Sequence, residues 1–122
     1  PDQLEAAIHP PGDRYGPRGN RFHAGLDFPA LAGTPVSAAA SGRVAFAGYD
    51  DGFGLTVVLD HGNGVRTRYA HLSRITVRPG LSVGVGGLVG RVGATGSATG
   101  PHLHFEVTVR GANADPAGAF GL

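Results

Sequence analysis

Apolar and polar residues alternate most clearly near the end of the chain, over residues 102–109. The apolar positions are Leu103, Phe105, Val107 and Val109, and the polar positions between them are His102, His104, Glu106 and Thr108. A period of two residues is typical of a strand that packs one face on a core and leaves the other open. The pattern therefore predicts a strand with a polar row opposite its buried face.

Two segments in the middle of the chain predict a β-hairpin. Residues 55–59 are a largely β-branched run of the kind found in buried strands. Residues 61–64 read His-Gly-Asn-Gly, and Asn-Gly is a strong signal for a tight hairpin turn. The following strand alternates, with Val65, Thr67, Tyr69 and His71 on one face and Arg66 and Arg68 on the other.

The remaining apolar segments are short and separated by glycine. They are residues 44–46, 75–77 and 88–89. No ten-residue stretch has a helical period, and the short connections favour antiparallel pairing. The sequence thus predicts a mostly β fold, a compact single domain of antiparallel sheets. Residues 1–12 are expected to be an irregular lead-in, and residues 13–122 to form the domain.

Composition limits the chemistry. The 22 glycines and nine prolines indicate many tight turns. Cysteine is absent, so any metal must be held by His, Asp or Glu. A net charge of +1 argues against a nucleic-acid surface. No apolar stretch approaches the roughly 20 residues of a membrane span, and no signal peptide is visible. If the protein is exported, this segment is a mature fragment or a domain of a longer chain.

Four of the six histidines fall in three short clusters, and the last cluster is the simplest. His102 and His104 stand two residues apart on the predicted strand, so their side chains point the same way, roughly 6.5 Å apart. This arrangement suits two imidazoles that converge on one site. A pair of solvated surface histidines would produce the same spacing.

The first cluster places His23 four residues before Asp27. In an extended strand their Cα atoms are roughly 13 Å apart, whereas zinc ligands lie about 2 Å from the ion. Shared ligation therefore requires a bend, which Gly25 permits. The alternative is a strand end at which Asp27 caps a turn.

Taken together, the clusters match a catalytic zinc site better than a structural one. His23, Asp27 and one later histidine would provide two imidazoles and one carboxylate and leave a fourth position open. Structural zinc sites usually have four ligands and favour Cys. The remaining histidines are then available to move protons near neutral pH.

The ordered set of motifs resembles the lysostaphin-type, LytM-like zinc metallopeptidases, which are peptidoglycan endopeptidases. The family pattern is H-x-x-x-D, then a histidine in a Tyr-Ala-His-Leu context, then H-x-H. Matching segments are residues 23–27, 69–72 and 100–106, with further agreement at 33–36, 38–42, 60–64 and 99–104. The resemblance covers about residues 13–118. Leu55 and residues 83–87 depart from the usual family text, outside the metal pattern.

The resemblance implies one Zn²⁺ per chain, bound by His23, Asp27 and His104, with His71 and His102 as catalytic histidines that do not bind the metal. It implies a groove across the sheet with the zinc on its floor. The implied substrates are peptide bonds of peptidoglycan stems or cross-bridges, cut outside the cytoplasm. Zinc would polarise the scissile carbonyl and activate a water, with one histidine accepting the proton and the other assisting the oxyanion. Which histidine has which role is open.

A few other residues have two interpretations each. Asn20 and Tyr69 are candidate substrate contacts, although Tyr69 fits a core position equally well. Glu106 either bonds a ligand imidazole or is solvated or paired with arginine. His9 and His61 are expected to be structural or inert.

Other functions remain to be separated. A non-catalytic cell-wall-binding or amidase-activating module of the same fold is the main alternative to the enzyme. A cell-wall amidase or carboxypeptidase is another. The bond that is cut, the host and the oligomeric state are not determined by the sequence.

Overall fold

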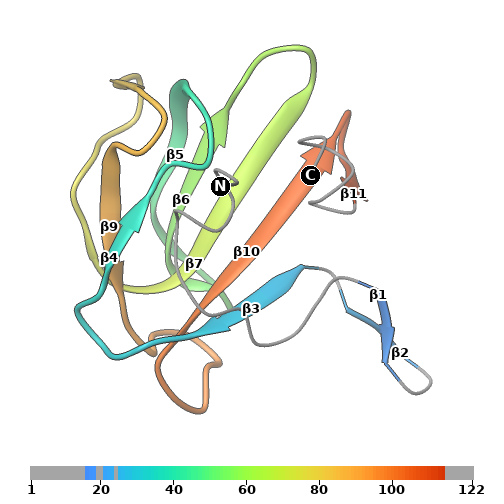
Figure 1. The fold of residues 1–122 in the computed structure, drawn as a ribbon, viewed down its shortest axis with the longest axis vertical. Coiled ribbons are helices and arrows are strands. Elements are labelled where there is room, and N and C mark those ends of the chain that lie inside the picture. The colour runs from blue at the N-terminus through green and yellow to red at the C-terminus, as the bar shows by residue number, and fades with distance from the viewer. Residues whose placement is uncertain (1–15, 19–20, 24, 115–122) are drawn as a thin grey trace.

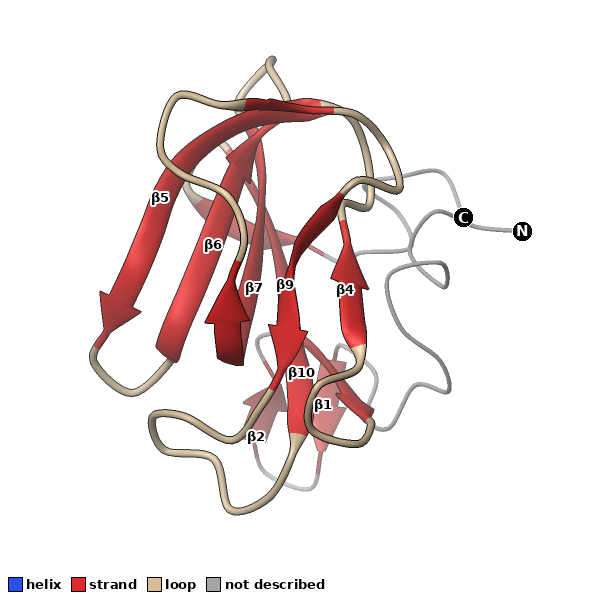
Figure 2. Ribbon diagram, turned by 90° about the vertical axis from the view of Figure 1, so that its left-hand side faces the viewer, coloured by secondary structure: helices blue, strands red, loops and turns tan. Residues whose placement is uncertain are grey.

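A computed structural model of the chain describes the backbone of residues 16–18, 21–23 and 25–114, and the side chains of residues 25–113. This part is built from strands and contains no helix (Figure 2). The strands are β1 (Gly16–Arg18), β2 (Arg21–His23), β3 (Leu26–Pro29), β4 (Pro35–Ser37), β5 (Gly42–Asp50), β6 (Gly54–Asp60), β7 (Val65–Ile75), β8 (Ser82–Val83), β9 (Leu88–Val92), β10 (His102–Val109) and β11 (Ala112–Ala114).

One large antiparallel sheet forms the body of the molecule (Figure 1). Its order is β11-β10-β7-β6-β5-β8, with β3 pairing to β10 and β9 pairing to both β7 and β4. β1 and β2 make a separate two-stranded ribbon, which was not predicted because three residues are too few to show an alternation. The prediction of a mostly β, single antiparallel domain is confirmed. The predicted lead-in, residues 1–12, lies outside the described residues.

The central hairpin is formed as predicted. Asn63 and Gly64, with φ of 54° and 77°, make the turn between β6 and β7. These left-handed conformations are tolerated by asparagine and cost glycine nothing, which explains the Asn-Gly pair. The neighbouring strand β5 runs from residue 42 to residue 50 and is therefore longer than the predicted 44–46 segment.

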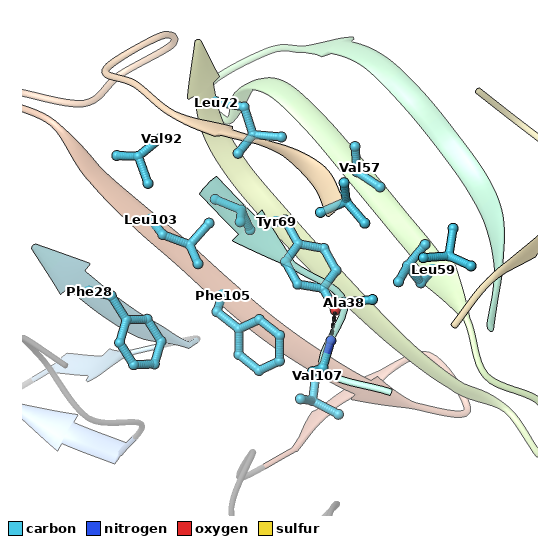
Figure 3. Packing of buried hydrophobic residues seen from close by; sticks show 14 of the residues in the cluster. Phe28, Ala38, Val57, Leu59, Tyr69, Leu72, Val92, Leu103, Phe105 and Val107 are labelled. Atoms are coloured by element: carbon cyan, nitrogen blue, oxygen red, sulfur yellow. Dashed lines mark hydrogen bonds between the residues drawn. The ribbon is translucent and has the colours of Figure 1, made fainter. Parts of the chain in front are cut away.

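The core lies on the apolar face of β10. Leu103, Phe105 and Val107 are fully buried, as are Val36 of β4 and Val92 of β9 in the same cluster. The sheet therefore curls so that its β4–β9 part covers the face of β10 and β7, and Figure 3 shows this packing. The period-two pattern of residues 102–109 is confirmed by this burial.

Tyr69 belongs to the core, so the prediction that it contacts substrate is wrong. Its side chain is 0% exposed, and its ring packs edge-on to Phe105 at 5.3 Å between centroids. Its hydroxyl accepts a hydrogen bond from the backbone N–H of Ala39, at 3.0 Å (Figure 3). It also accepts one from the hydroxyl of Thr67, at 2.9 Å. Burial raises the pKa of Tyr69 to about 12.

His71 was predicted on the same face as Tyr69, and this is also wrong. Tyr69 pairs with Val57, but Leu72 pairs with Leu55, so three steps on β7 oppose two on β6. The extra residue is a β-bulge, and His71 has a φ of 60°, rare for a residue with a Cβ. The bulge turns the His71 side chain away from the core, because one added residue inverts the alternation.

Replacing Tyr69 with phenylalanine should lower stability without touching the histidines. The ring remains, but the N–H of Ala39, whose residue is 0% exposed, loses the acceptor Tyr69 provides. Leaving a buried donor unsatisfied costs about 1–3 kcal/mol. Urea unfolding of Tyr69→Phe measures this loss, and Tyr49→Phe, at a residue 62% exposed, is the matched control. Equal stability of the two variants would contradict the role given to the hydroxyl.

Candidate metal centre

The register of two antiparallel strands brings Asp27 and His104 together. They are directly opposed partners in the pairing of β3 with β10. Directly opposed side chains on one face of an antiparallel pair are close neighbours. His104 Nδ1 donates to Asp27 Oδ1 at 2.7 Å. Residues 77 positions apart in the chain therefore meet at one point, as their predicted roles require.

The chain bends immediately before β3, at Gly25. A Cβ at this position would collide with the carbonyl oxygen of Phe105 and lie 2.9 Å from Cγ of Glu106. The predicted bend is confirmed, and glycine is required there because the backbone passes very close to β10. The predicted ligand His23 ends β2, and its side chain lies outside the described residues, as does Asn20. Their assignments stay predictions.

His71 and His102 face the same site with the same tautomer. Nδ1 of His71 is 2.7 Å from the carbonyl oxygen of Thr95, and Nδ1 of His102 is 2.9 Å from that of Gly100. A carbonyl oxygen only accepts, so each Nδ1 carries the hydrogen, and Nε2 of each neutral ring is a proton acceptor. The ring centroids of His71 and His102 lie 4.8 Å apart. Nε2 of His102 is 3.7 Å from Oδ1 of Asp27.

The surroundings of His71 keep it neutral. Burial lowers the pKa of His71, and the charges of His102 and His104 lower it further, against an opposing hydrogen bond to Thr95. An uncharged imidazole at neutral pH is the form that accepts a proton. His71 thus combines an unusual backbone conformation with a lowered pKa, and such combinations concentrate at functional sites.

Glu106 supports His104 from the side opposite Asp27. Its Oε2 accepts from His104 Nε2 at 2.8 Å, its Oε1 lies 3.7 Å from Nε of Arg68, and the residue is only 7% exposed. Of the two interpretations of Glu106, the bond to the imidazole and the pairing with arginine are both present, and solvation is excluded. A carboxylate that holds one ring nitrogen orients the other toward a metal.

The two carboxylates make this a place for positive charge. Burial alone lowers the pKa of His104, but hydrogen bonds and charge from Asp27 and Glu106 outweigh it and raise the pKa to about 9. In the absence of a metal, His104 is therefore a cation between two carboxylates. The carboxylates of Asp27 and Glu106 thus stabilise positive charge at this point.

The site opens into a hollow of about 270 Å³. It is lined by Asp27, Gly52, Phe53, His71, Ser97, Ala98, Thr99, His102 and His104. The walls are the β5–β6 turn and the loop before β10. Phe53 was not singled out from the sequence, although its ring stacks on His104 with centroids 5.9 Å apart. A large apolar residue inside the glycine-flanked turn Gly52-Phe53-Gly54 was the available signal.

The profile of peptidase family M23 matches residues 21–116, which is most of the chain. The chain belongs to peptidase family M23. The resemblance to lysostaphin-type metallopeptidases, and with it the prediction of an enzyme, is confirmed. The match begins before the first motif and continues past the last, so it includes every predicted ligand and catalytic histidine of this M23 domain.

Relatives with a similar sequence include two peptidoglycan-acting or carboxypeptidase enzymes by name. The chain is 46% identical over 96 residues to the DD-carboxypeptidase/endopeptidase Mpg of Neisseria meningitidis, covering 79% of this chain and 22% of that protein. It is 43% identical over 104 residues to the peptidoglycan DD-endopeptidase ShyA of Vibrio cholerae, covering 85% of this chain and 23% of that one. The M23 domain therefore spans less than a quarter of the length of these relatives.

Solved structures with a similar fold include two peptidases. The catalytic domain of the antimicrobial peptidase lysostaphin from Staphylococcus simulans has a TM-score of 0.85 at 33% identity, with 99% of this chain and 98% of that one covered. A zinc-containing peptidase from Vibrio cholerae has a TM-score of 0.74 at 39% identity, covering 84% of this chain and 32% of that one. The M23 domain therefore has the fold of the lysostaphin catalytic domain.

The donor set of the M23 domain fits zinc. Nitrogen of histidine and oxygen of aspartate are usual zinc ligands, and no thiolate is available in this cysteine-free chain. Among the side chains of residues 25–113, no three metal-binding groups are gathered as a complete site. Asp27 and His104 supply two, and the predicted third, His23, is outside that range. The contact between two of the predicted ligands, beside carboxylates that stabilise positive charge, agrees with the predicted metal.

Proposed function

We propose that this M23 domain is a zinc-dependent endopeptidase that hydrolyses peptide bonds in peptidoglycan stem peptides or cross-bridges. The main observation in its favour is the meeting of Asp27 and His104 at 2.7 Å, with His71 and His102 facing the same hollow. Family membership and the name of the relative ShyA support the substrate class. The name of the zinc-containing structural neighbour supports the metal.

His23, Asp27 and His104 would hold one zinc ion per chain. When bound, it would supply Lewis-acid chemistry to the scissile carbonyl and the attacking water. Glu106 holds Nε2 of His104, so that Nδ1 is the nitrogen presented beside Asp27. Phe53 stacks on the same ring and limits its rotation. The domain therefore provides a ligand whose orientation is set before any metal or substrate arrives.

His71 and His102 would handle the protons. The Nδ1–H of each ring donates a hydrogen bond to a backbone carbonyl oxygen. Nε2 of the neutral ring therefore accepts a proton, and Nε2 donates a hydrogen bond only when the ring is protonated. One of them takes a proton from the attacking water and later returns it to the leaving amine. The other, when protonated, is placed to hydrogen-bond the developing oxyanion. Their shared tautomer does not distinguish the two roles, but the lowered pKa of His71 favours His71 as the proton acceptor.

A digest of purified peptidoglycan tests the reaction. An endopeptidase should convert cross-linked dimers into monomers and leave the sugar-to-peptide amide intact, as read from the new termini by mass spectrometry. The name of the Neisseria relative also includes a carboxypeptidase activity, so loss of the last residue of uncross-linked stems must be scored separately. Release of unsubstituted glycan would indicate an amidase and contradict the proposal.

The main alternative is a non-catalytic module that binds the wall or activates an amidase. It is disfavoured because all three predicted ligands and both further histidines are retained in the sequence. Metal analysis separates the two, since the enzyme should hold about one zinc per chain after loading. A domain that stays free of zinc and cuts nothing would support the module.

The site of action is proposed to be outside the cytoplasm, as one domain of a longer exported protein. The substrate class and the small share of the relatives that the chain spans, 22% and 23%, support this. No helix in the described part of the chain is long and apolar enough to cross a membrane.

A further inference from the structure

A second hollow lies next to the histidine site, on the same side of the sheet. Its volume is about 580 Å³. It is lined by Phe46, Asp50, Val58, Gly64, Arg66, Thr67, Arg68, Glu106, Thr108, Arg110 and Gly111. Glu106 and Thr108 follow His104 at alternate positions of β10, so all three point to one face. The hollow thus continues the polar row of β10 that begins with His102 and His104.

Two contacts join the hollows directly. Glu106, which lines the second hollow, bonds His104 of the first at 2.8 Å. Arg68 also lines the second hollow, and Phe53 lines the first hollow. The guanidinium of Arg68 lies 4.5 Å from the centre of the Phe53 ring. The two spaces therefore share a wall, and a chain lying across the site can occupy both.

The floor of the second hollow is a row across four strands. Glu106 of β10 pairs with Arg68 of β7, Arg68 pairs with Val58 of β6, and Val58 pairs with Phe46 of β5. These strands lie side by side in Figure 1. Phe46 is 39% exposed although it is a large apolar residue. The floor therefore offers apolar surface at its far end and charge near the histidines.

The positive charge at the rim is only partly neutralised. Arg68 is already held by Asp50 at 2.8 Å and by Glu106 at 3.7 Å. Arg66 has a single exposed contact with Asp60 at 3.4 Å, and such surface pairs are weak. Arg110 is exposed and forms no ion pair with a described residue. Among the described residues of this hollow, Arg66 and Arg110 are thus the least neutralised cations.

Distance along β10 indicates which part of a substrate reaches these arginines. Strands rise about 3.4 Å per residue, so Glu106 and Thr108 lie roughly 7 and 14 Å from His104 along the strand. An extended peptide spans about 3.5 Å per residue, so this range corresponds to two to four residues from the bond at the metal site. Arg66 pairs with Thr108 and therefore stands at the far end of the range.

We propose that the second hollow binds a carboxylate-bearing part of a stem peptide, two to four residues from the cleaved bond, through Arg66 and Arg110. This inference rests on the proposed function for the identity of the peptide. It makes stem peptides with free side-chain or terminal carboxylates the preferred substrates. Bridges of glycine alone, which have no carboxylate along their length, cannot use the two arginines.

Binding of uncross-linked stem peptides to the zinc-loaded chain tests the proposal without relying on turnover. Two matched tetrapeptides are compared by calorimetry, one with free carboxylates and one with the same carboxylates amidated. The parent protein should bind the free form several-fold more tightly, with the difference shrinking at high salt. Arg66→Gln and Arg110→Gln should each weaken binding of the free form about threefold to fivefold and leave the amidated form unchanged. Arg78→Gln, at an exposed arginine outside both hollows, is the control.

The outcomes separate this inference from the function on which it rests. The inference would be overturned if the parent protein bound the two peptides with equal affinity. It would also be overturned if the arginine variants lost the same affinity for the free and the amidated peptide. Either result counts even if the protein digests peptidoglycan. Selective binding by a protein that cuts nothing would support the inference and contradict the proposed reaction. Self-association of the chain that Arg110→Gln abolishes, without any peptide binding, would assign the hollow to a second copy and also overturn it. Thermal unfolding of each variant confirms that the fold is intact.

Discussion

His104→Ala is expected to lose zinc and activity together. His104 provides the nitrogen that meets Asp27, and it separates the carboxylates of Asp27 and Glu106, which bond its two nitrogens at 2.7 and 2.8 Å. Removing only an outer partner of a metal ligand typically costs 10-fold to 100-fold, so losing the ligand itself should cost more than about 100-fold in hydrolysis. Zinc should fall from about one per chain to near zero by elemental analysis.

A histidine away from the site provides the control for this variant. His61 bonds the carbonyl of Ser41 and the hydroxyl of Thr67, each at 2.7 Å, and does not line the hollow of His104. His61→Ala should keep its zinc and its hydrolysis rate. If His104→Ala binds zinc as tightly as the parent, the metal assignment is wrong, whatever happens to the activity.

His71→Ala is expected to keep zinc and lose most turnover. His71 is a proton carrier in the proposed mechanism and not a ligand, and general acid–base groups typically contribute about 100-fold to 10,000-fold. The loss should appear in kcat with the zinc content unchanged. Because His102 has the same tautomer and lies 4.8 Å away, it can retain part of the proton transfer. The double variant with His102→Ala should therefore fall below either single variant.

The outcome that contradicts this role is simple. A His71→Ala protein that digests peptidoglycan at the parent rate would remove His71 from the mechanism. A protein that has lost its zinc would instead place His71 in the metal site. Thermal unfolding is the necessary companion measurement, since His71 sits in a bulge with a φ of 60°, and alanine in the same conformation is strained.

Local patterns account for the parts of the fold that the sequence predicted well. The alternation along residues 102–109 and the Asn-Gly turn depend on neighbours within a few residues, and both are confirmed. Short strands without such a pattern were harder to predict, and β1 with three residues was not predicted at all. The candidate site followed from an ordered set of motifs rather than from any one of them, because each motif alone had an ordinary structural explanation.

The errors at Tyr69 and His71 have one physical cause. A uniform alternation places both on one face, but the pairing of β7 with β6 inserts an extra residue between them. A bulge depends on how two strands pair, and it therefore leaves no signal in the pattern of one strand. As a result, Tyr69 is buried in the core, where its hydroxyl accepts a hydrogen bond from the N–H of Ala39, while His71 lines the same hollow as His102 and His104.

The sequence by itself determined the fold class, the polar face of the last strand and the identity of the residues that could bind a metal. These depend on residue chemistry and on periodicities that a short segment contains. Only the tertiary structure decided that Glu106 holds His104, that Phe53 stacks on it, and that Arg66 and Arg110 line a second hollow next to the site. Such contacts join strands distant in the chain, so they follow from register and sheet curvature and not from local sequence.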